Sequence, residues 1–313
     1  RVQRRRVRSF QVSGGYKMVY ADNAATTKIR SEVLNEMIPY LTSNYGNASS
    51  LYSIGRTSKH AIDNARAQVA SLINCNPNEI YFTSCGSESD NTALKGIAFA
   101  NKKKGNHIIT SKIEHPAILE SCKFLEKQGF DISYINVDSD GFINLQELEN
   151  AIRPTTILIS IMFANNEIGT VQPIEDIAEI AHNHNIIFHT DAVQAVGHIP
   201  IDVNKLGVDM LSASAHKFNG PKGIGFLYVR KGTSISPYVD GGAQELGMRG
   251  GTENVASIVG MATALKKNCD EMQQTTNRLY ILERNFIDTL CATGVDFIRN
   301  GAENRAPGNI NIS

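Results

Sequence analysis

The sequence predicts an α/β fold built on a mostly parallel sheet. From Met18 onward, short β-branched runs alternate with longer amphipathic segments, which is typical of strands connected by helices. Hydrophobic residues make up 42% and charged residues 20% of the 313 positions, as in ordinary globular proteins. The length allows one large core or two domains. We expect no membrane span, because no run of about 18 apolar residues occurs.

The expected elements follow one another along the chain without a repeat. Short apolar runs predict strands at 80–83, 107–110, 131–137, 156–163, 186–190, 208–214 and 223–229. Helical periodicity predicts helices at 31–41, 57–72, 92–101, 116–128, 145–152 and 174–182. The glycine-rich stretch 240–254 is expected to be a long functional loop. A long helix is predicted from Val255 to about Asn285, with a break near Cys269 or Thr275.

Charge is distributed unevenly although the formal net charge is zero. Residues 1–17 carry six basic side chains and no acidic one, which leaves 25 basic and 31 acidic residues elsewhere. This acidic remainder argues against nucleic acid as the main partner. We interpret 1–17 as a leader or an added upstream segment, with an arginine-rich targeting remnant as the lesser alternative.

Cysteine and histidine usage gives no sign of a structural metal or a disulfide framework. The five cysteines are scattered and form no C-x-x-C pair (Cys75, Cys85, Cys122, Cys269 and Cys291). A reducing cytoplasm is therefore the expected compartment. His182, His184 and His189 straddle a helix end and a strand, so we expect no metal site there.

The stretch Ser84–Asn91 is a candidate anion site. It follows a short buried strand and precedes a predicted helix, and backbone N–H groups at such a helix start bind phosphate well. The alternative is a simple helix cap by Ser87 or Ser89, with Glu88 in the first turn. The local pattern does not decide between the two.

Chemically versatile side chains follow several predicted strands at their carboxyl ends, where open α/β sheets bind ligands. His115 lies at a strand-to-helix junction, and Asn165–Gly169 follows the most apolar strand. Asp191 ends another strand, and Lys217 connects the last two. A partly desolvated lysine at such a place becomes nucleophilic, although a single loop lysine or histidine is more often an ordinary surface residue.

A Schiff-base lysine, a carboxylate for a pyridinium nitrogen and a phosphate anchor are what a pyridoxal 5'-phosphate (PLP) site needs. The chain resembles the cysteine desulfurases of the NifS and IscS type, within the class V aminotransferases. The match is ordered and covers essentially 18–313. It is carried by Ala21–Thr27, Gly46–Ser50, Phe82–Asn91, Glu114–His115, Asn165–Gly169, Asp191–Gln194, His216–Lys217 and Met248–Asn254.

The resemblance implies the PLP-dependent transferase fold type I. In that fold a large domain with a mostly parallel seven-stranded sheet accompanies a smaller α/β domain. After the leader 1–17, we expect a segment at 18–32 that packs with the small domain. A large PLP-binding domain is then expected at 33–258, and 259–313 is the start of the small domain, which this chain leaves incomplete.

The resemblance also implies roles for particular residues. Lys217 would bind PLP as a Schiff base, and His115 would stack on the ring and assist proton transfer. Asp191 would pair with the ring nitrogen. The remaining implied cofactor contacts are Gln194 and Asn166 at the ring hydroxyl and its surroundings, Gly86, Ser87, Ser214 and His216 at the phosphate, and Thr252 from the second subunit of a homodimer. Asn166 is also an implied substrate residue.

The implied activity is that of a sulfurtransferase. L-cysteine is converted to L-alanine, and its sulfur passes to an enzyme cysteine as a persulfide for iron–sulfur or other thio-cofactor assembly. The sequence departs from the family pattern at two positions. Cys85 stands where the family has glycine, and Leu246 stands where it usually has arginine. None of the five cysteines matches the family's sulfur-accepting loop, which we expect beyond residue 313. A selenocysteine lyase type of enzyme and a catalytically silent scaffold for assembly partners remain alternatives.

Overall fold

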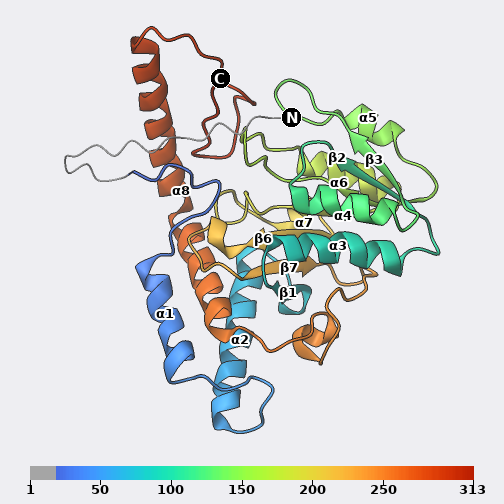
Figure 1. The fold of residues 1–313 in the computed structure, drawn as a ribbon, viewed down its shortest axis with the longest axis vertical. Helices are drawn as coiled ribbons and strands as arrows, with labels where there is room; N and C mark the ends of the chain where they lie inside the picture. Colours follow the sequence, from blue (N-terminus) through green and yellow to red (C-terminus); the bar gives the residue numbers. More distant parts are fainter. Residues whose placement is uncertain (1–18) are drawn as a thin grey trace.

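The computed structural model describes residues 19–313, in which a seven-stranded sheet lies between two layers of helices (Figure 1). The predicted leader 1–17 lies outside the described residues. The strands are Ile80–Thr83 (β1), His107–Ser111 (β2), Asp131–Ile135 (β3), Thr156–Ser160 (β4), Ile187–Asp191 (β5), Met210–Ser214 (β6) and Gly225–Val229 (β7). Their order is β1-β7-β6-β5-β4-β2-β3, and only β7 runs antiparallel to its neighbours. The predicted mostly parallel seven-stranded sheet is confirmed.

Helices connect the strands and cover both faces. They are Ser31–Thr42 (α1), Ser53–Leu72 (α2), Gly86–Ala100 (α3), Pro116–Glu126 (α4), Leu145–Asn150 (α5), Ile174–Asn183 (α6), Val203–Leu206 (α7) and Val255–Ala292 (α8). Apolar residues of α3 and α4 form the core on one face of the sheet, whereas α2, α6 and the first part of α8 pack on the other. Among the described residues, no helix has the length and apolar content that a membrane crossing requires.

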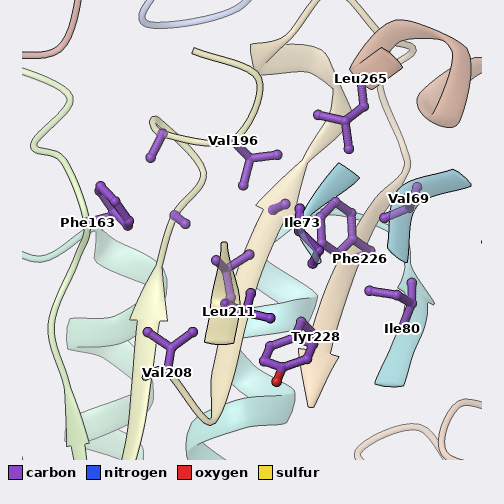
Figure 2. Close-up of a cluster of buried hydrophobic side chains, with 14 of the residues drawn as sticks. Val69, Ile73, Ile80, Phe163, Val196, Val208, Leu211, Phe226, Tyr228 and Leu265 are labelled. Atoms are coloured by element: carbon purple, nitrogen blue, oxygen red, sulfur yellow. The ribbon is translucent and has the colours of Figure 1, made fainter. Parts of the chain in front are cut away.

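Side-chain alternation along the strands explains why helices cover both faces. In β7, Leu227 belongs to the α3–α4 side, whereas Phe226 and Tyr228 belong to the α2–α8 side. Successive residues of a strand point to opposite faces, so a strand that is apolar throughout must be buried on both. Figure 2 shows Phe226 and Tyr228 clustered with Ile80 of β1 and Val69 of α2.

Three helix predictions are wrong in their bounds by more than two residues, and the first is the helix predicted at 57–72, which begins at Ser53. The helix predicted from residue 92 begins at Gly86, six residues earlier, so the segment expected to be a loop forms the first turns of α3. The break predicted near Cys269 or Thr275 does not occur, because α8 runs from Val255 to Ala292 as one helix. Neither proline nor glycine follows Gly260 inside α8, so nothing in its sequence forces the helix to end earlier.

The direction of the strands positions the site. Since β1, β2, β4, β5 and β6 run the same way, the loops after them meet at one edge of the sheet. The N-terminal segment reaches that edge, where Thr27 donates hydrogen bonds to the His216 carbonyl. Arg30 of the same segment binds Glu271 of α8 at 2.6 Å. The domain boundary predicted at 258/259 falls inside α8 and stays a prediction.

Candidate active site

A cavity of about 540 Å³ lies at the carboxyl edge of the sheet. Loops after β1, β2, β4, β5 and β6 line it, together with Asp22, Ala24 and Ala25 of the N-terminal segment. The structure brings nine of the ten predicted site residues into this lining: Gly86, Ser87, His115, Asn166, Asp191, Gln194, Ser214, His216 and Lys217. The tenth, Thr252, lies elsewhere.

Lys217 ends a short 3-10 turn that follows β6 directly. Its Nζ donates hydrogen bonds to the carbonyl oxygens of Ala24 and Ala25, the latter at 3.1 Å. Burial lowers the pKa of the amine below its ordinary value, while the negative charge of Asp191 opposes that shift. The amine therefore lies in a partly desolvated setting that favours its unprotonated, nucleophilic form.

Asp191 is the last residue of β5, and its side chain is buried at the bottom of the cavity. Its Oδ1 accepts a hydrogen bond from the Val193 N–H at 2.9 Å. Burial raises the pKa of this carboxyl, while the Val193 N–H and the positive charges of His115 and Lys217 act in the other direction. The Asp191 carboxyl thus lies where protonation of His115 or Lys217 would favour its charged form.

His115 is the N-cap residue of α4. The Ala117 N–H donates to its Nδ1 at 3.1 Å, so Nδ1 is the acceptor and Nε2 carries the ring proton of the neutral form. The imidazole itself is exposed on the cavity side. One nitrogen is therefore fixed by the backbone, and the ring is oriented without being buried.

The start of α3 offers backbone N–H groups to the cavity. Its N-cap is Cys85, whose side chain makes no capping bond, so the predicted alternative of a cap by Ser87 or Ser89 is wrong. A Cβ atom on Gly86 would lie 2.7 Å from Val193 Cγ2, which leaves room there for glycine only. An uncapped helix N-terminus with exposed Ser87 beside it is a site that favours an anion.

Ser214 and His216 complete this anion-binding corner. Ser214 is 2% exposed, and its Oγ has no hydrogen-bond partner among the described residues. A buried hydroxyl without a partner costs free energy, so its presence here indicates a ligand. His216 Nδ1 lies 3.1 Å from the Thr26 hydroxyl, and burial together with the Lys217 charge lowers the pKa of its ring.

Gln194 and Asn166 line the remaining walls. Gln194 Nε2 donates to the Ala24 carbonyl at 3.0 Å, next to the hydrogen bonds of Lys217. Asn166 Nδ2 donates to Glu167 Oε1 at 2.7 Å. Both side chains are partly buried and keep polar atoms at the cavity.

Thr252 does not join the others within the described chain. It is exposed and lines a second cavity of about 210 Å³ on the side of Phe82 and Arg249. The predicted contribution of Thr252 therefore has no support from the first cavity of the same chain.

Sequence reasoning missed the buried acids beneath the cavity. Asp90, on the second turn of α3, lines the cavity although it is 1% exposed. Single ligand atoms of Asp90, His115 and Asp191 lie within 4.8 Å of one another. The sequence prediction placed residues 84–91 in a loop. It therefore did not indicate that residues 86 and 90 lie on one face of α3.

The three histidines considered for a metal have separate partners. His182 Nε2 pairs with Asp209 at 3.1 Å, and His184 Nε2 lies 3.9 Å from Glu149. His189 is buried between the hydroxyls of Ser160 and Ser212. All five cysteines, which lie within the described range, are free thiols, and Cys85 alone of them lines the large cavity.

The fold and the cavity define a class of enzyme. The chain belongs to the class V aminotransferase family, whose model matches residues 19–311. Members of this family depend on PLP.

Within the family, the chain is similar to cysteine desulfurases of the IscS type, which confirms the resemblance. It is 54% identical to cysteine desulfurase IscS of Methanosarcina thermophila over 302 residues, which are 96% of this chain and 75% of the relative. It is 53% identical to cysteine desulfurase IscS of Dictyoglomus turgidum, over 94% of this chain and 75% of the relative.

Two solved structures are also similar. A NifS-like protein superimposes with a TM-score of 0.91 at 42% identity, over 94% of this chain and 81% of that one. A structure titled SspA in complex with cysteine superimposes with a TM-score of 0.84 at 41% identity, over 94% of this chain and 83% of that one.

The residues present fit PLP. The unpartnered hydroxyl of Ser214 and the uncapped start of α3 suit its phosphate, and Gly86 leaves space that a side chain would fill. Lys217 offers an amine to the aldehyde, and the buried carboxylate of Asp191 suits a cationic ring nitrogen.

Proposed function

We propose that this protein is a cysteine desulfurase that converts L-cysteine to L-alanine and passes the sulfur on as a persulfide. The observation that carries the proposal is the placement of the desolvated Lys217 amine and the buried Asp191 carboxylate around one cavity. The IscS-type relatives and the cysteine complex of a similar structure support the choice of substrate.

Each lining residue has a proposed task in holding the cofactor. Lys217 would bond to the aldehyde, Asp191 would pair with the ring nitrogen, and His115 would stack on the ring. Gln194 and Asn166 would bind at the ring hydroxyl, and Asn166 would also contact the substrate. Gly86, Ser87, Ser214 and His216 would bind the phosphate.

PLP, when bound, supplies an electron sink for the negative charge that develops at the substrate's Cα. Lys217 Nζ accepts the Cα proton, which the lowered pKa of its amine favours, and returns it when alanine forms. The Nε2 of His115 is the second proton carrier at the cavity, because its Nδ1 is engaged with Ala117. The charge of Asp191 keeps the ring nitrogen protonated.

The sulfur transfer balances without an external oxidant. A thiolate attacks the sulfur of the substrate, the substrate's Cβ–S bond breaks, and the electron pair left on Cβ takes up a proton to give the methyl group of alanine. The accepting thiolate becomes a persulfide. The family's accepting loop matches none of the five cysteines. We therefore assign no acceptor among them, Cys85 included, since it lies in the loop that begins α3, where the phosphate is proposed to bind.

We further propose that the protein works as a homodimer in which Thr252 reaches the phosphate of the partner subunit. Thr252 is exposed and outside the large cavity of its own chain. An exposed apolar surface supports an interface on α1 and the following loop, where Leu41 is 62%, Tyr45 73% and Leu51 89% exposed. The sulfur acceptor is proposed to be an iron–sulfur scaffold or another thio-cofactor protein, and the free cysteines favour a cytoplasmic location.

The proposal is tested with the protein at the full length that its gene encodes. With PLP, L-cysteine and dithiothreitol, it should release alanine and sulfide in equal amounts. L-Serine, which lacks the sulfur, should give no alanine.

Two other outcomes of this assay would favour a selenocysteine lyase or a catalytically silent scaffold. Turnover of L-selenocysteine without turnover of L-cysteine would point to a selenocysteine lyase. A protein that binds no PLP would be a silent scaffold, and the proposed function would then be wrong.

A further inference from the structure

Asp90 is a buried acid that the proposed chemistry does not yet use. Its side chain is 1% exposed on α3, and its Oδ1 has no hydrogen-bond partner among the described residues. That oxygen lies 3.9 Å from His189 Nε2. One carboxylate oxygen of Asp90 also lies within 4.8 Å of one of Asp191. Two acids thus share a water-poor space beneath the cavity.

The surroundings of Asp90 offer no cation that is committed to it. His189 is neutral, because burial lowers the pKa of its ring to about 3, and both its nitrogens contact serine hydroxyls. Burial and then the charge of Asp191 raise the pKa of Asp90 well above its ordinary value. The titratable and polar groups that face Asp90 are Cys85 of the α3 N-cap, Glu114 and His115 before α4, His189 and Asp191 of β5, and Ser212 of β6.

Asp191 has a backbone donor and two nearby basic side chains, whereas the donor that favours charge on Asp90 is the Ser212 hydroxyl, whose effect on the pKa is smaller than that of burial. Asp191 accepts the Val193 N–H and lies near the positive charges of His115 and Lys217. Two carboxylates this close in a buried space cannot both be charged at low cost, so the one with donors and cations keeps the charge.

We propose that Asp90 is a positioning residue that keeps its own proton, so that Asp191 is the single charged carboxylate beneath the cavity. The inference rests on the proposed function, in which that charge holds the protonated ring nitrogen. A second charge would add a repulsion, because no cation among the described residues is paired with Asp90.

The test compares thermal unfolding of the wild type, Asp90→Asn, Asp191→Asn and the double variant at pH 5 and pH 8.5, each with and without PLP. The unfolded chain releases the Asp90 proton near pH 4, whereas the folded chain retains it to higher pH, so folding becomes less favourable as pH rises. Asn removes this loss. Asp90→Asn should therefore raise the Tm at both pH values, and the gain should be larger at pH 8.5 than at pH 5 by about 2–4 °C.

Measuring Asp90→Asn in the wild type and in the Asp191→Asn variant separates the effect of the neighbouring charge from the effect of burial. The gain from Asp90→Asn should shrink in the Asp191→Asn background, where the like charge is gone. An equal gain at both pH values, or in both backgrounds, would overturn the proposal. So would loss of PLP binding in Asp90→Asn, since a neutral residue at 90 would then not suffice.

Asp90→Ser is a second neutral variant should Asn fail to fold. The unfolding experiments do not depend on catalysis. If the unfolding measurements give the expected differences but the protein does not convert cysteine, the proposed function is wrong and the protonation of Asp90 still holds.

Discussion

Lys217 Nζ donates a hydrogen bond to the Ala25 carbonyl at 3.1 Å, across 192 positions of the sequence. The Ala24 carbonyl accepts from the same amine and also from Gln194 Nε2. The N-terminal segment therefore forms a wall of the cavity and orients the lysine through backbone groups. This relationship connects the start of the chain to the chemistry at the carboxyl edge of β6.

Ser214→Ala should weaken PLP binding without destabilising the protein. The Ser214 Oγ is buried without a partner, so the substitution breaks no internal hydrogen bond. A bond to a charged phosphate is worth about 1.5–3 kcal/mol, so the Kd for PLP should rise by at least about tenfold. Fluorescence titration measures the Kd, and denaturant unfolding measures the stability.

Ser160→Ala is the matched control for that prediction. The Ser160 hydroxyl lies 2.9 Å from His189 Nδ1 and does not line the cavity. Its loss should lower the free energy of unfolding and leave the Kd for PLP nearly constant. Equal effects of the two substitutions on the Kd would contradict the assignment of Ser214.

Stability should fall as pH rises because of Glu114. Burial raises the pKa of its carboxyl from 4.5 to about 8, so the folded protein keeps a proton that the unfolded chain has released. The free energy of unfolding should therefore decline between about pH 4.5 and pH 8 and level off above.

Glu114→Gln should remove part of that decline, because glutamine keeps an oxygen for the Ser111 hydroxyl and the Met162 N–H. The comparison needs denaturant unfolding of both proteins at pH 5 and pH 8. The variant should gain relative to the wild type at pH 8. An identical difference at the two pH values would show that Glu114 does not titrate in this range.

Arg66→Met should be strongly destabilising. Arg66 forms two hydrogen bonds to the Glu245 carboxylate, at 2.7 and 2.8 Å, and both side chains are less than 10% exposed. Removing the arginine leaves a buried charge, which costs about 3–5 kcal/mol. Glu245 also accepts the Phe82 N–H of β1, so in Arg66→Met the loop that carries Thr252 keeps this hydrogen bond but loses its contact with α2.

Lys59→Met is the control, because the Lys59–Asp63 pair is exposed and such pairs contribute about 1 kcal/mol or less. Urea unfolding of the two variants gives both values. A cost below about 1 kcal/mol for Arg66→Met would contradict the description of the pair as a buried anchor.

The sheet was predictable because its strands are short, apolar and bounded by turns. β1 has the predicted bounds, β2 ends one residue later than predicted, and β5 is shifted by one residue at both ends. The site followed from the same pattern, since parallel strands bring Asp191 and Lys217 to one edge. Periodicity was sufficient to predict where these two residues lie, whereas their roles in PLP binding were implied by the family resemblance.

The start of α3 and the turn at Glu245 and Leu246 depend on tertiary contacts, which the local sequence does not indicate. The polar run Ser87–Asn91 has no helical apolar pattern, yet it forms the first turns of α3 because Ser89 and Asp90 are buried against the sheet. Glu245 and Leu246 have φ values of 48° and 57°, which no local signal indicates for these residues. The pairing of Glu245 with Arg66, 179 positions away, fixes that turn.

The central claim is that Lys217 is the lysine that binds PLP. Borohydride fixes the cofactor to the amine that carries it, and peptide mass spectrometry then locates that amine. The label should appear on Lys217 in the wild type, persist in Lys222→Ala and disappear in Lys217→Ala. Label on another lysine, or undiminished labelling of Lys217→Ala, would contradict the account.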